Sequence, residues 1–181
     1  AVYALIAEEA CLDAGVLLHY HEILTGVAQS TEGWEVETVG KGIERTIAAR
    51  ELIDCTGDAD VVGMLNLPRE RSDVRQPGTL IFDFGGYDAR ELDVEVVQEH
   101  FEAAMEADEL QPGDFWRAED SLFIDFLRGG GHNAQHIFGA DSSTSSTQTD
   151  ANVEGHRAAL RLLRFIRTIP GCEQATLEQM S

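Results

Sequence analysis

Two stretches of the chain combine residue types and spacing that could support chemistry, and the first is a short turn. Thr56-Gly57-Asp58 follows the apolar pair Leu52-Ile53 and precedes a second apolar segment, which predicts a buried strand, a tight turn and a short helix. Gly57 would let a ligand come close to the backbone, and Asp58 can cap the helix. Because ligands in open α/β sheets lie outside the carboxyl ends of strands, the turn is a candidate binding site, with a purely structural corner as the alternative.

The second stretch contains a pair of histidines. His132 and His136 lie four residues apart around a glycine-rich loop, and either could act as a general acid or donate a hydrogen bond to a substrate. Loop histidines without a role are the alternative. His19 and His21 point to the same side of an extended segment, but no third ligand stands at matching spacing. We therefore name His132 and His136 as candidate catalytic residues and predict no metal site.

Several other kinds of site are disfavoured by the residues present. Asp58 and Asp60 lack the further acids and the glycine of a calcium loop. Ser142 to Ser146 contains no G-x-S-x-G elbow. No G-x-G-x-x-G follows a strand, and Gly129-Gly130-Gly131 has neither its spacing nor its helix. We expect Cys55, beside the turn, to be a small buried residue rather than a redox centre.

The composition is that of an acidic globular protein. The 181 residues are 43% hydrophobic and 25% charged, enough for one domain or slightly more. With 33 acidic and 13 basic side chains the net charge is −20, which repels phosphate backbones, so we predict no nucleic-acid partner. No apolar run approaches the roughly 18 residues of a membrane span. Three widely spaced cysteines without a C-x-x-C pair favour the reducing cytoplasm.

The first third of the chain predicts a helix followed by a β-meander. We expect residues 2–14 to form a helix that ends at Gly15 and buries Tyr3, Leu5, Ile6 and Leu12. Alternation and turn residues predict strands at 16–20, 23–29, 34–39 and 43–49, a strand before Thr56 and a helix at 59–65. No residue before Val2 caps the first helix, so we expect the chain to be a fragment of a longer protein.

The rest of the chain predicts a mixture of strands and helices. Its pattern indicates strands at 79–84, 121–127 and 134–138, an amphipathic helix at 92–110, a loop at 128–133, a polar tract at 141–150 and a long helix at 151–168. We expect Asp141 to pair with Arg157 and so to fix the polar tract to the long helix. This order of elements predicts a fold between α/β and α+β, with domains at 1–66 and 67–181.

Several segments resemble the FAD-dependent oxidoreductases of the two-dinucleotide-binding-domain type. Residues 53–60, Ile-Asp-Cys-Thr-Gly-Asp-Ala-Asp, are similar to the family's I-D-A-T-G-D-G-D, with Cys55 and Ala59 in place of Ala and Gly. Residues 13–19 resemble the wording E-A-G-V-x-L-L-x-H that precedes a β-meander, and residues 76–85 resemble Q-P-x-T-L-x-F-x-x-G. Residues 139–165 match a further family motif, with His156 in place of its arginine. The likeness covers nearly the whole chain, in the expected order.

This resemblance implies a cofactor and gives each domain a role. Thr56, Gly57 and Asp58 would pass close to the nucleotide of FAD. Residues 1–66 would be the second half of an FAD-binding domain, which contains the meander, and residues 67–181 a substrate-side domain. In relatives the G-x-G-x-x-G segment that binds the pyrophosphate lies before the point where this chain starts.

The predicted function is therefore that of a flavoprotein fragment. The parent protein would be an oxidoreductase of unknown substrate, and the partner of this chain would be the remainder of its own polypeptide. We expect the isolated chain to bind FAD weakly or not at all and to be inactive. The alternative is a non-catalytic α+β binding or interaction domain with no cofactor, in which the turn at Thr56 is structural. An upstream strand followed by G-x-G-x-x-G would favour the enzyme.

Overall fold

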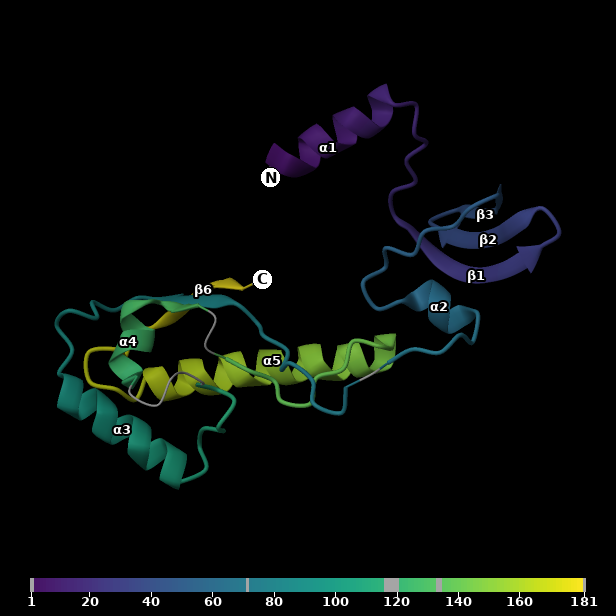
Figure 1. Cartoon of the computed structure of the whole chain (residues 1–181). Coiled ribbons are helices and arrows are strands. Elements are labelled where there is room, and N and C mark those ends of the chain that lie inside the picture. The colour runs from purple at the N-terminus through teal and green to yellow at the C-terminus, as the bar shows by residue number, and fades with distance from the viewer. Residues whose placement is uncertain (1, 71, 116–120, 133–134, 181) are drawn as a thin grey trace. The chain divides into compact units, whose positions relative to one another are not determined.

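The computed structural model describes residues 2–70, 72–115, 121–132 and 135–180, except the side chain of His132. The chain divides into two units, residues 1–71 and 72–181 (Figure 1). Both combine helices with antiparallel strands, so the chain has the predicted mixed α+β character. The assignment of a cofactor-binding role to 1–66 and a substrate-side role to 67–181 stays a prediction.

The first unit contains the predicted β-meander. Strands β1 (Glu22–Ser30), β2 (Gly33–Gly40) and β3 (Ile43–Ala49) pair antiparallel in the order β1-β2-β3. Trp34 lies opposite Gln29 on one side and Ala49 on the other. Gly42, in the turn between β2 and β3, has a φ of +74°, a conformation that glycine adopts without strain. Period-2 alternation with turn residues thus located all three strands correctly.

Helix α1 (Val2–Asp13) forms where it was predicted but does not bury its side chains. It ends as expected, because Gly15 has a φ of +74° and the N–H of Val16 donates to the carbonyl of Cys11 at 2.9 Å. The predicted burial is wrong, since the exposed fractions are 84% for Tyr3, 67% for Leu5, 59% for Ile6 and 57% for Leu12. The physical reason is that the described part of its own unit covers α1 only partly, at Ala7, Glu8 and Cys11, and buries none of its residues.

Two short strands predicted in the first unit are absent from its described residues. Residues 16–20 and 51–55 run without regular structure, although both include apolar residues. A strand requires a neighbour for its backbone hydrogen bonds, and in the described part of this unit only β1, β2 and β3 pair with one another. The apolar side chains of Leu17 and Ile53 are accordingly exposed. A short helix, α2 (Asp60–Met64), does follow the turn at Thr56.

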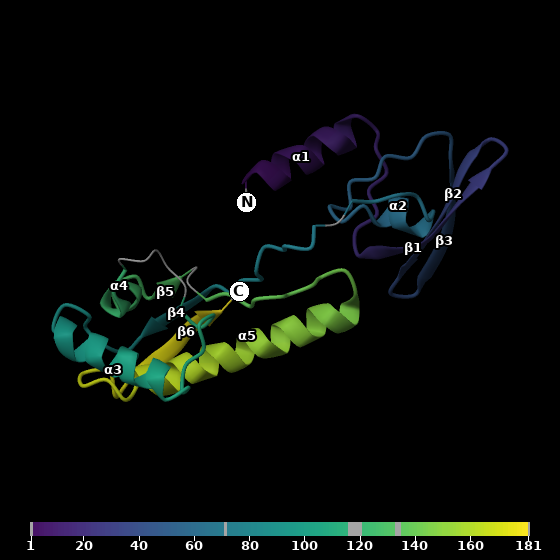
Figure 2. The ribbon, with the colours of Figure 1, turned by 60° about the horizontal axis from the view of Figure 1, so that its bottom comes forward.

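The second unit is built around a small sheet and an aromatic core. Strands β4 (Phe82–Gly85), β5 (Gly131–His132) and β6 (Thr176–Met180) pair antiparallel in the order β5-β4-β6. Helices α3 (Val94–Glu106), α4 (Phe123–Arg128) and α5 (Ser145–Ile166) complete it. Long helix α5 runs beside the small sheet (Figure 2), and its Leu162 and Ile166 belong to the same buried cluster as Phe82.

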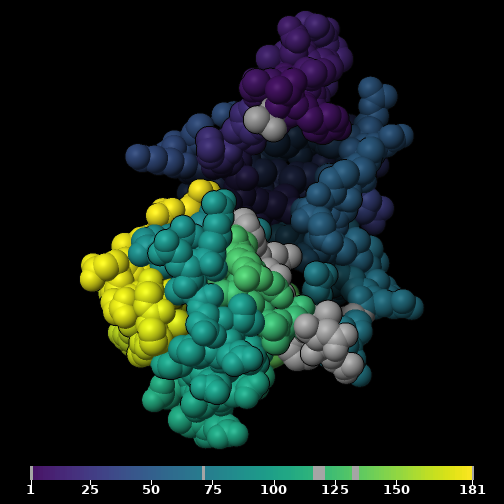
Figure 3. Space-filling model, turned by 90° about the vertical axis from the view of Figure 1, so that its left-hand side faces the viewer, coloured from purple at the N-terminus to yellow at the C-terminus, as the bar shows by residue number. Residues whose placement is uncertain are grey.

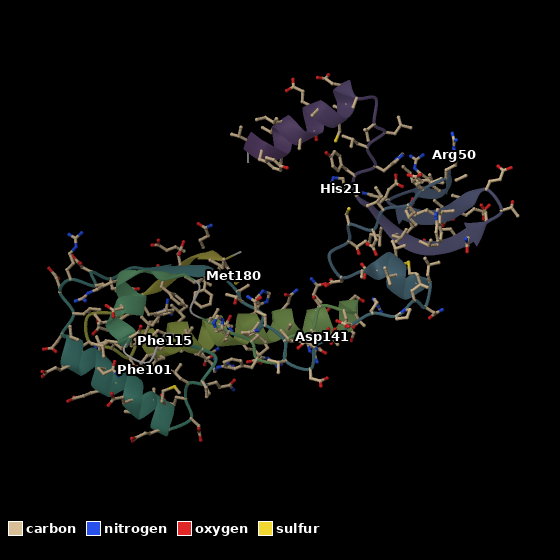
Figure 4. The ribbon with its side chains drawn as sticks, in the orientation of Figure 1. His21, Arg50, Phe101, Phe115, Asp141 and Met180 are labelled. Atoms are coloured by element: carbon tan, nitrogen blue, oxygen red, sulfur yellow. The ribbon has the colours of Figure 1, made fainter. Side chains whose placement is uncertain are left out.

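The aromatic residues of the second unit pack closely. The rings of Phe101 and Phe123 are stacked with centroids 4.9 Å apart, and Phe115 meets Phe101 edge-on at 5.3 Å. Figure 4 labels Phe101 and Phe115 at this contact, and in the space-filling view of Figure 3 the teal residues of α3 lie against the green residues of α4. Offset and edge-on ring pairs stabilise a core beyond simple burial. Val97 and Ala104 of α3 are buried, as the predicted helical spacing required.

Four predictions for the second unit need correction. Residues 121–127 form helix α4 rather than a strand, because Phe123, Ile124, Phe126 and Leu127 are all buried, and such spacing fits one side of a helix. The predicted strand at 134–138 is reduced to a bridge between Ile137 and Gly78, and Ala134 lies outside the described residues. The strand predicted at 79–84 begins at Phe82. Helix α5 begins at Ser145, not at Ala151, because the Thr144 hydroxyl accepts a hydrogen bond from the N–H of Thr147.

Candidate functional site

The turn at Thr56 is organised by Asp54. One carboxylate oxygen of Asp54 accepts hydrogen bonds from the N–H and the hydroxyl of Thr56, at 3.0 and 2.7 Å, and the other accepts from the N–H of Val62 at 3.3 Å. The Thr56 hydroxyl oxygen in turn accepts from the N–H of Asp60 at 2.9 Å. The backbone N–H of Thr56, then its hydroxyl, lowers the pKa of Asp54 below the ordinary value of 3.8. Asp54 and Thr56 therefore hold the start of α2.

The prediction that Asp58 caps the helix is wrong. Ala59 occupies the N-cap position in a left-handed conformation, with no side-chain hydrogen bond to the helix. The free N–H groups of the first turn donate instead to the side chains of Asp54 and Thr56, which lie earlier in the chain. Asp-x-Thr is the sequence of an Asx-type turn, and this signal could have identified Asp54 as the organising residue. The prediction that Cys55 is buried is also wrong, because Cys55 is exposed.

The turn leaves Gly57 and Asp58 open. Gly57 has a φ of +86°, and a Cβ added to it would meet no atom within 4 Å. Within the described residues, the N–H groups of Gly57 and Asp58 make no hydrogen bond to the protein. The turn thus presents backbone donors beside a position without a side chain. Such an arrangement can receive an oxygen-bearing ligand at close range.

The two candidate histidines both lie next to the segment 78–82 of the second unit. The backbone of His132 pairs with Phe82 in the small sheet, while its side chain lies outside the described part of the structure. His136 is half-buried, and its Nδ1 lies 3.2 Å from the Thr79 hydroxyl oxygen and 3.1 Å from the carbonyl oxygen of Gln135. Its Nε2 has no protein partner among the described residues, so this nitrogen is available to a ligand.

A pocket of about 240 Å³ lies beside Thr79, within the second unit. One wall is the face of α5 that carries Gln148, Ala151, Asn152 and Gly155, spaced three or four residues apart so that they share one side of the helix. The other wall is the segment that begins at Gln76 together with residues 140–142. Two of the segments that carry the family resemblance, 76–85 and 139–165, thus meet at one pocket. Sequence reasoning missed this pocket, although the spacing in α5 was visible.

An ion pair lies at the edge of the pocket. Arg75 contacts the carboxylate of Asp141 at 2.7 Å, and Figure 4 labels Asp141 beside the first turns of α5. The predicted pair between Asp141 and Arg157 is wrong, because Arg157 contacts Glu154 instead, at 3.9 Å. Asp141, at the start of the polar tract, is therefore linked to the segment before β4 rather than to Arg157 of α5. The reason is that Arg157 lies three residues from Glu154 on the same helix face.

The described residues also bear on metal sites and membrane spans. Residues 2–70, 72–115, 121–132 and 135–180 contain no group of three or more His, Cys, Asp or Glu side chains that could hold a metal ion. In the same ranges, no helix combines the length and the apolar character needed to cross a membrane.

Comparison with protein families identifies the class of protein. The model of the FAD dependent oxidoreductase family matches residues 1–181, the whole chain. The chain therefore belongs to this family, and the resemblance seen in the sequence is confirmed. No curated protein and no solved structure matched in the corresponding comparisons. The family is one of oxidoreductases that depend on FAD, so the general class of chemistry is oxidoreduction.

Proposed function

We propose that this chain supplies part of the FAD site and the substrate-side domain of a flavin-dependent oxidoreductase, and that it acts together with the remainder of a longer polypeptide. The observation that carries the proposal is the family match over residues 1–181. The geometry of the turn at Gly57 supports it, because an open glycine and two free N–H groups suit a nucleotide oxygen. The three cysteines, all free, favour a reducing compartment such as the cytoplasm.

The fit of this chain to FAD is partial. The N–H groups of Gly57 and Asp58 would donate to the nucleotide, and each such bond contributes about 1 kcal/mol. Retention of a molecule as large as FAD requires burial of most of its surface, and residues 1–181 contain no G-x-G-x-x-G to receive the pyrophosphate. The net charge of −20 also opposes an anionic ligand. The isolated chain should therefore bind FAD weakly and lack activity.

His136 is the residue that we propose for proton exchange with the substrate. When bound, the flavin supplies the hydride or electron transfer. The Nδ1 of His136 is engaged by Thr79 and Gln135, which fixes the ring, while Nε2 is open to a ligand. A histidine held in this way can take up or release the proton that accompanies oxidation or reduction of a C–O or C–N bond. His132 remains a second candidate for the same role.

Substitution of Gly57 tests the cofactor proposal. In the full-length protein, Gly57→Val should lower the bound flavin about tenfold or more, since it blocks close approach and weakens at least one hydrogen bond. Gly42→Val is the matched control, because Gly42 also has a positive φ and open space but lies in the β2–β3 turn. Flavin absorbance of the purified proteins gives the answer. Equal flavin content in both variants would contradict the proposed contact.

Substitution of His136 tests the proton role. His136→Gln should slow the reduction of bound flavin by a reducing substrate about 100-fold or more and remove one limb of its pH profile, with flavin content unchanged. His156→Gln, at an exposed position of α5, is the control. The alternative function, a binding domain without a cofactor, is favoured if the full-length protein contains no flavin. A stoichiometric flavin in the isolated 181-residue chain would instead overturn the partial fit described above.

A further inference from the structure

We propose that the pocket between residues 76–80 and the first half of α5 binds an uncharged polyhydroxy compound of about the size of one sugar ring. The pocket has a volume of about 240 Å³ and lies entirely within the second unit. It is therefore a binding site that needs neither the turn at Gly57 nor a flavin. The proposal rests on three features of the pocket, namely its unengaged polar side chains, its balanced charges and its apolar floor.

The polar side chains that line the pocket have free hydrogen-bonding capacity. The side chains of Gln76, Ser142, Gln148 and Asn152 are solvent-exposed, and they make no hydrogen bond to any described residue. Each of the three amides carries a donor and an acceptor, and the hydroxyl of Ser142 is both at once. A ligand hydroxyl is likewise donor and acceptor, so a compound with several hydroxyl groups can use all four side chains.

The charges at the pocket disfavour an ionic ligand. Asp141 is the one charged residue among the described residues that line the pocket, and it pairs with Arg75, next to the lining residue Gln76, at 2.7 Å. A cationic ligand would have to displace Arg75 from Asp141, and an anionic one would have to displace Asp141 from Arg75. The net charge of −20 adds a further cost for an anion. An uncharged ligand bears none of these costs.

The floor of the pocket is apolar and packs against a glycine. Leu80, Ile137, Ala140 and Ala151 contribute aliphatic surface. A Cβ at Gly155 would stand 3.1 Å from Ile137 and 3.4 Å from Leu80, so the helix packs closely against the floor at this point. Sugar rings and cyclic polyols have a face of C–H groups and an edge of hydroxyl groups. This pattern matches an apolar floor beneath a polar rim.

Titration of the whole 181-residue chain with four probes tests the proposal. Glucose and myo-inositol are the uncharged probes, and gluconate and glucosamine are their charged counterparts of similar size. We expect glucose or myo-inositol to shift the side-chain amide resonances of Gln148 and Asn152 in the nitrogen-15-labelled protein, with a dissociation constant on the order of 1 mM, as is usual for ligands of this size. Gluconate and glucosamine should bind about tenfold more weakly. Absence of shifts with both uncharged probes, or equal binding of all four, overturns the proposal.

Substitutions on α5 locate the binding. Ala151→Phe fills the pocket and should weaken binding about tenfold or more, whereas Val153→Phe, at an exposed position on the same helix, should leave it unchanged. The double variant Gln148→Ala with Asn152→Ala removes two amides without adding bulk, and it should also weaken binding. Its circular dichroism should match that of the parent chain, because alanine favours the helix. Binding that survives both the Ala151→Phe and the double substitution overturns the site.

Discussion

The two units of this chain differ in what they do with their apolar residues. Of the 20 hydrophobic residues that are buried among those described, only Val36 and Val61 belong to the first unit, and the other 18 belong to the second. The first unit nevertheless has many large apolar side chains, which are mostly exposed, as at Leu17 and Ile53. The second unit therefore contains a core of its own, whereas the described first unit is held mainly by the strand pairing of its meander.

Because of this difference, we expect the two units to unfold in separate transitions. Hydrophobic burial is the largest favourable contribution to folding, and nearly all of it lies between residues 82 and 175. The antiparallel ladder of β1, β2 and β3 exposes one or both faces of each strand, and a small isolated sheet is only marginally stable. We expect the first unit to open at lower denaturant concentration than the second.

Loss of the central ring of the second unit should have the largest effect. Phe123 is completely buried and contacts the rings of Phe101, Phe115, Phe126 and Phe165. Phe123→Ala should lower the free energy of unfolding of the second unit by about 3–5 kcal/mol. Val36→Ala, in the first unit, removes two carbons and should cost about 1.5 kcal/mol. Both changes in the free energy of unfolding can be measured by urea titration monitored by hydrogen exchange, which reports on each unit separately. A Val36→Ala effect as large as that of Phe123→Ala would contradict the comparison.

Removing the cation that pairs with a buried carboxylate of the second unit should have the next largest effect. Asp114 is 1% exposed and receives Nε and Nη2 of Arg161 at 2.9 and 2.7 Å. Arg161→Met leaves this carboxylate without its cation, so we expect a loss of about 3 kcal/mol in the second unit. Arg157→Met is the control, because Arg157 is exposed and its contact with Glu154 is 3.9 Å long, worth at most about 0.5 kcal/mol. The free energy of unfolding is measured by urea titration. Equal decreases in both variants would show that the Asp114 carboxylate can remain buried without a paired cation at little cost.

The sequence predicted the regular parts of both units well and their packing poorly. Strict alternation around Trp34 gave the meander, and helical spacing gave α3, because local periodicity encodes these elements. The apolar run at Phe123 was assigned to a strand, since a short run of buried residues has the same pattern in a helix and in a strand. Strand β6 was missed because its residues, Thr176 to Met180, are mostly exposed and do not alternate.

In the candidate site, too, the feature set by adjacent residues was predicted, and the features set by residues far apart in the chain were not. Thr56-Gly57-Asp58 was identified because its three residues are adjacent, and the turn does form there. Asp58 was predicted to cap the helix because it is the acid nearest to the helix start. The carboxylate that accepts a hydrogen bond from the helix is instead that of Asp54, eight residues before Val62. The pocket beside Thr79 joins residues some 70 positions apart. No local pattern connects such residues, so only the folded second unit brings them together.

Acid should loosen the turn of the first unit without unfolding the second. Hydrogen bonds to its carboxylate hold the pKa of Asp54 below 3.8, so its contribution is present at neutral pH and is lost as the pH falls below 3.8 through the folded-state pKa. The protection of the Thr56 amide, measured against its intrinsic exchange rate at each pH, should then fall, while amides of α5 keep their protection. Asp54→Ala should reproduce this loosening at neutral pH. Asp58→Ala should not, because among the described residues the N–H groups at the start of the helix donate to Asp54 and Thr56 and not to the side chain of Asp58. Faster exchange at Thr56 in both variants would show that Asp58 also stabilises the start of the helix.

Added salt should produce the smallest effect, and it should act on both units alike. Residues 1–71 carry 13 acidic and 5 basic side chains, a net charge of −8, and residues 72–181 carry 20 and 8, a net charge of −12. The charge per residue is thus nearly the same in the two units, and so is the self-repulsion that destabilises each folded state. Neutral salt at about 0.15 M reduces the range of this repulsion to about 8 Å.

We expect both thermal transitions to move upward by a few degrees and by similar amounts, as measured by calorimetry at increasing sodium chloride. Parallel shifts would leave the gap between the transitions intact, which assigns that gap to the aromatic core rather than to charge. A shift of only the lower transition would mean that repulsion, not missing burial, is what makes the first unit the weaker one.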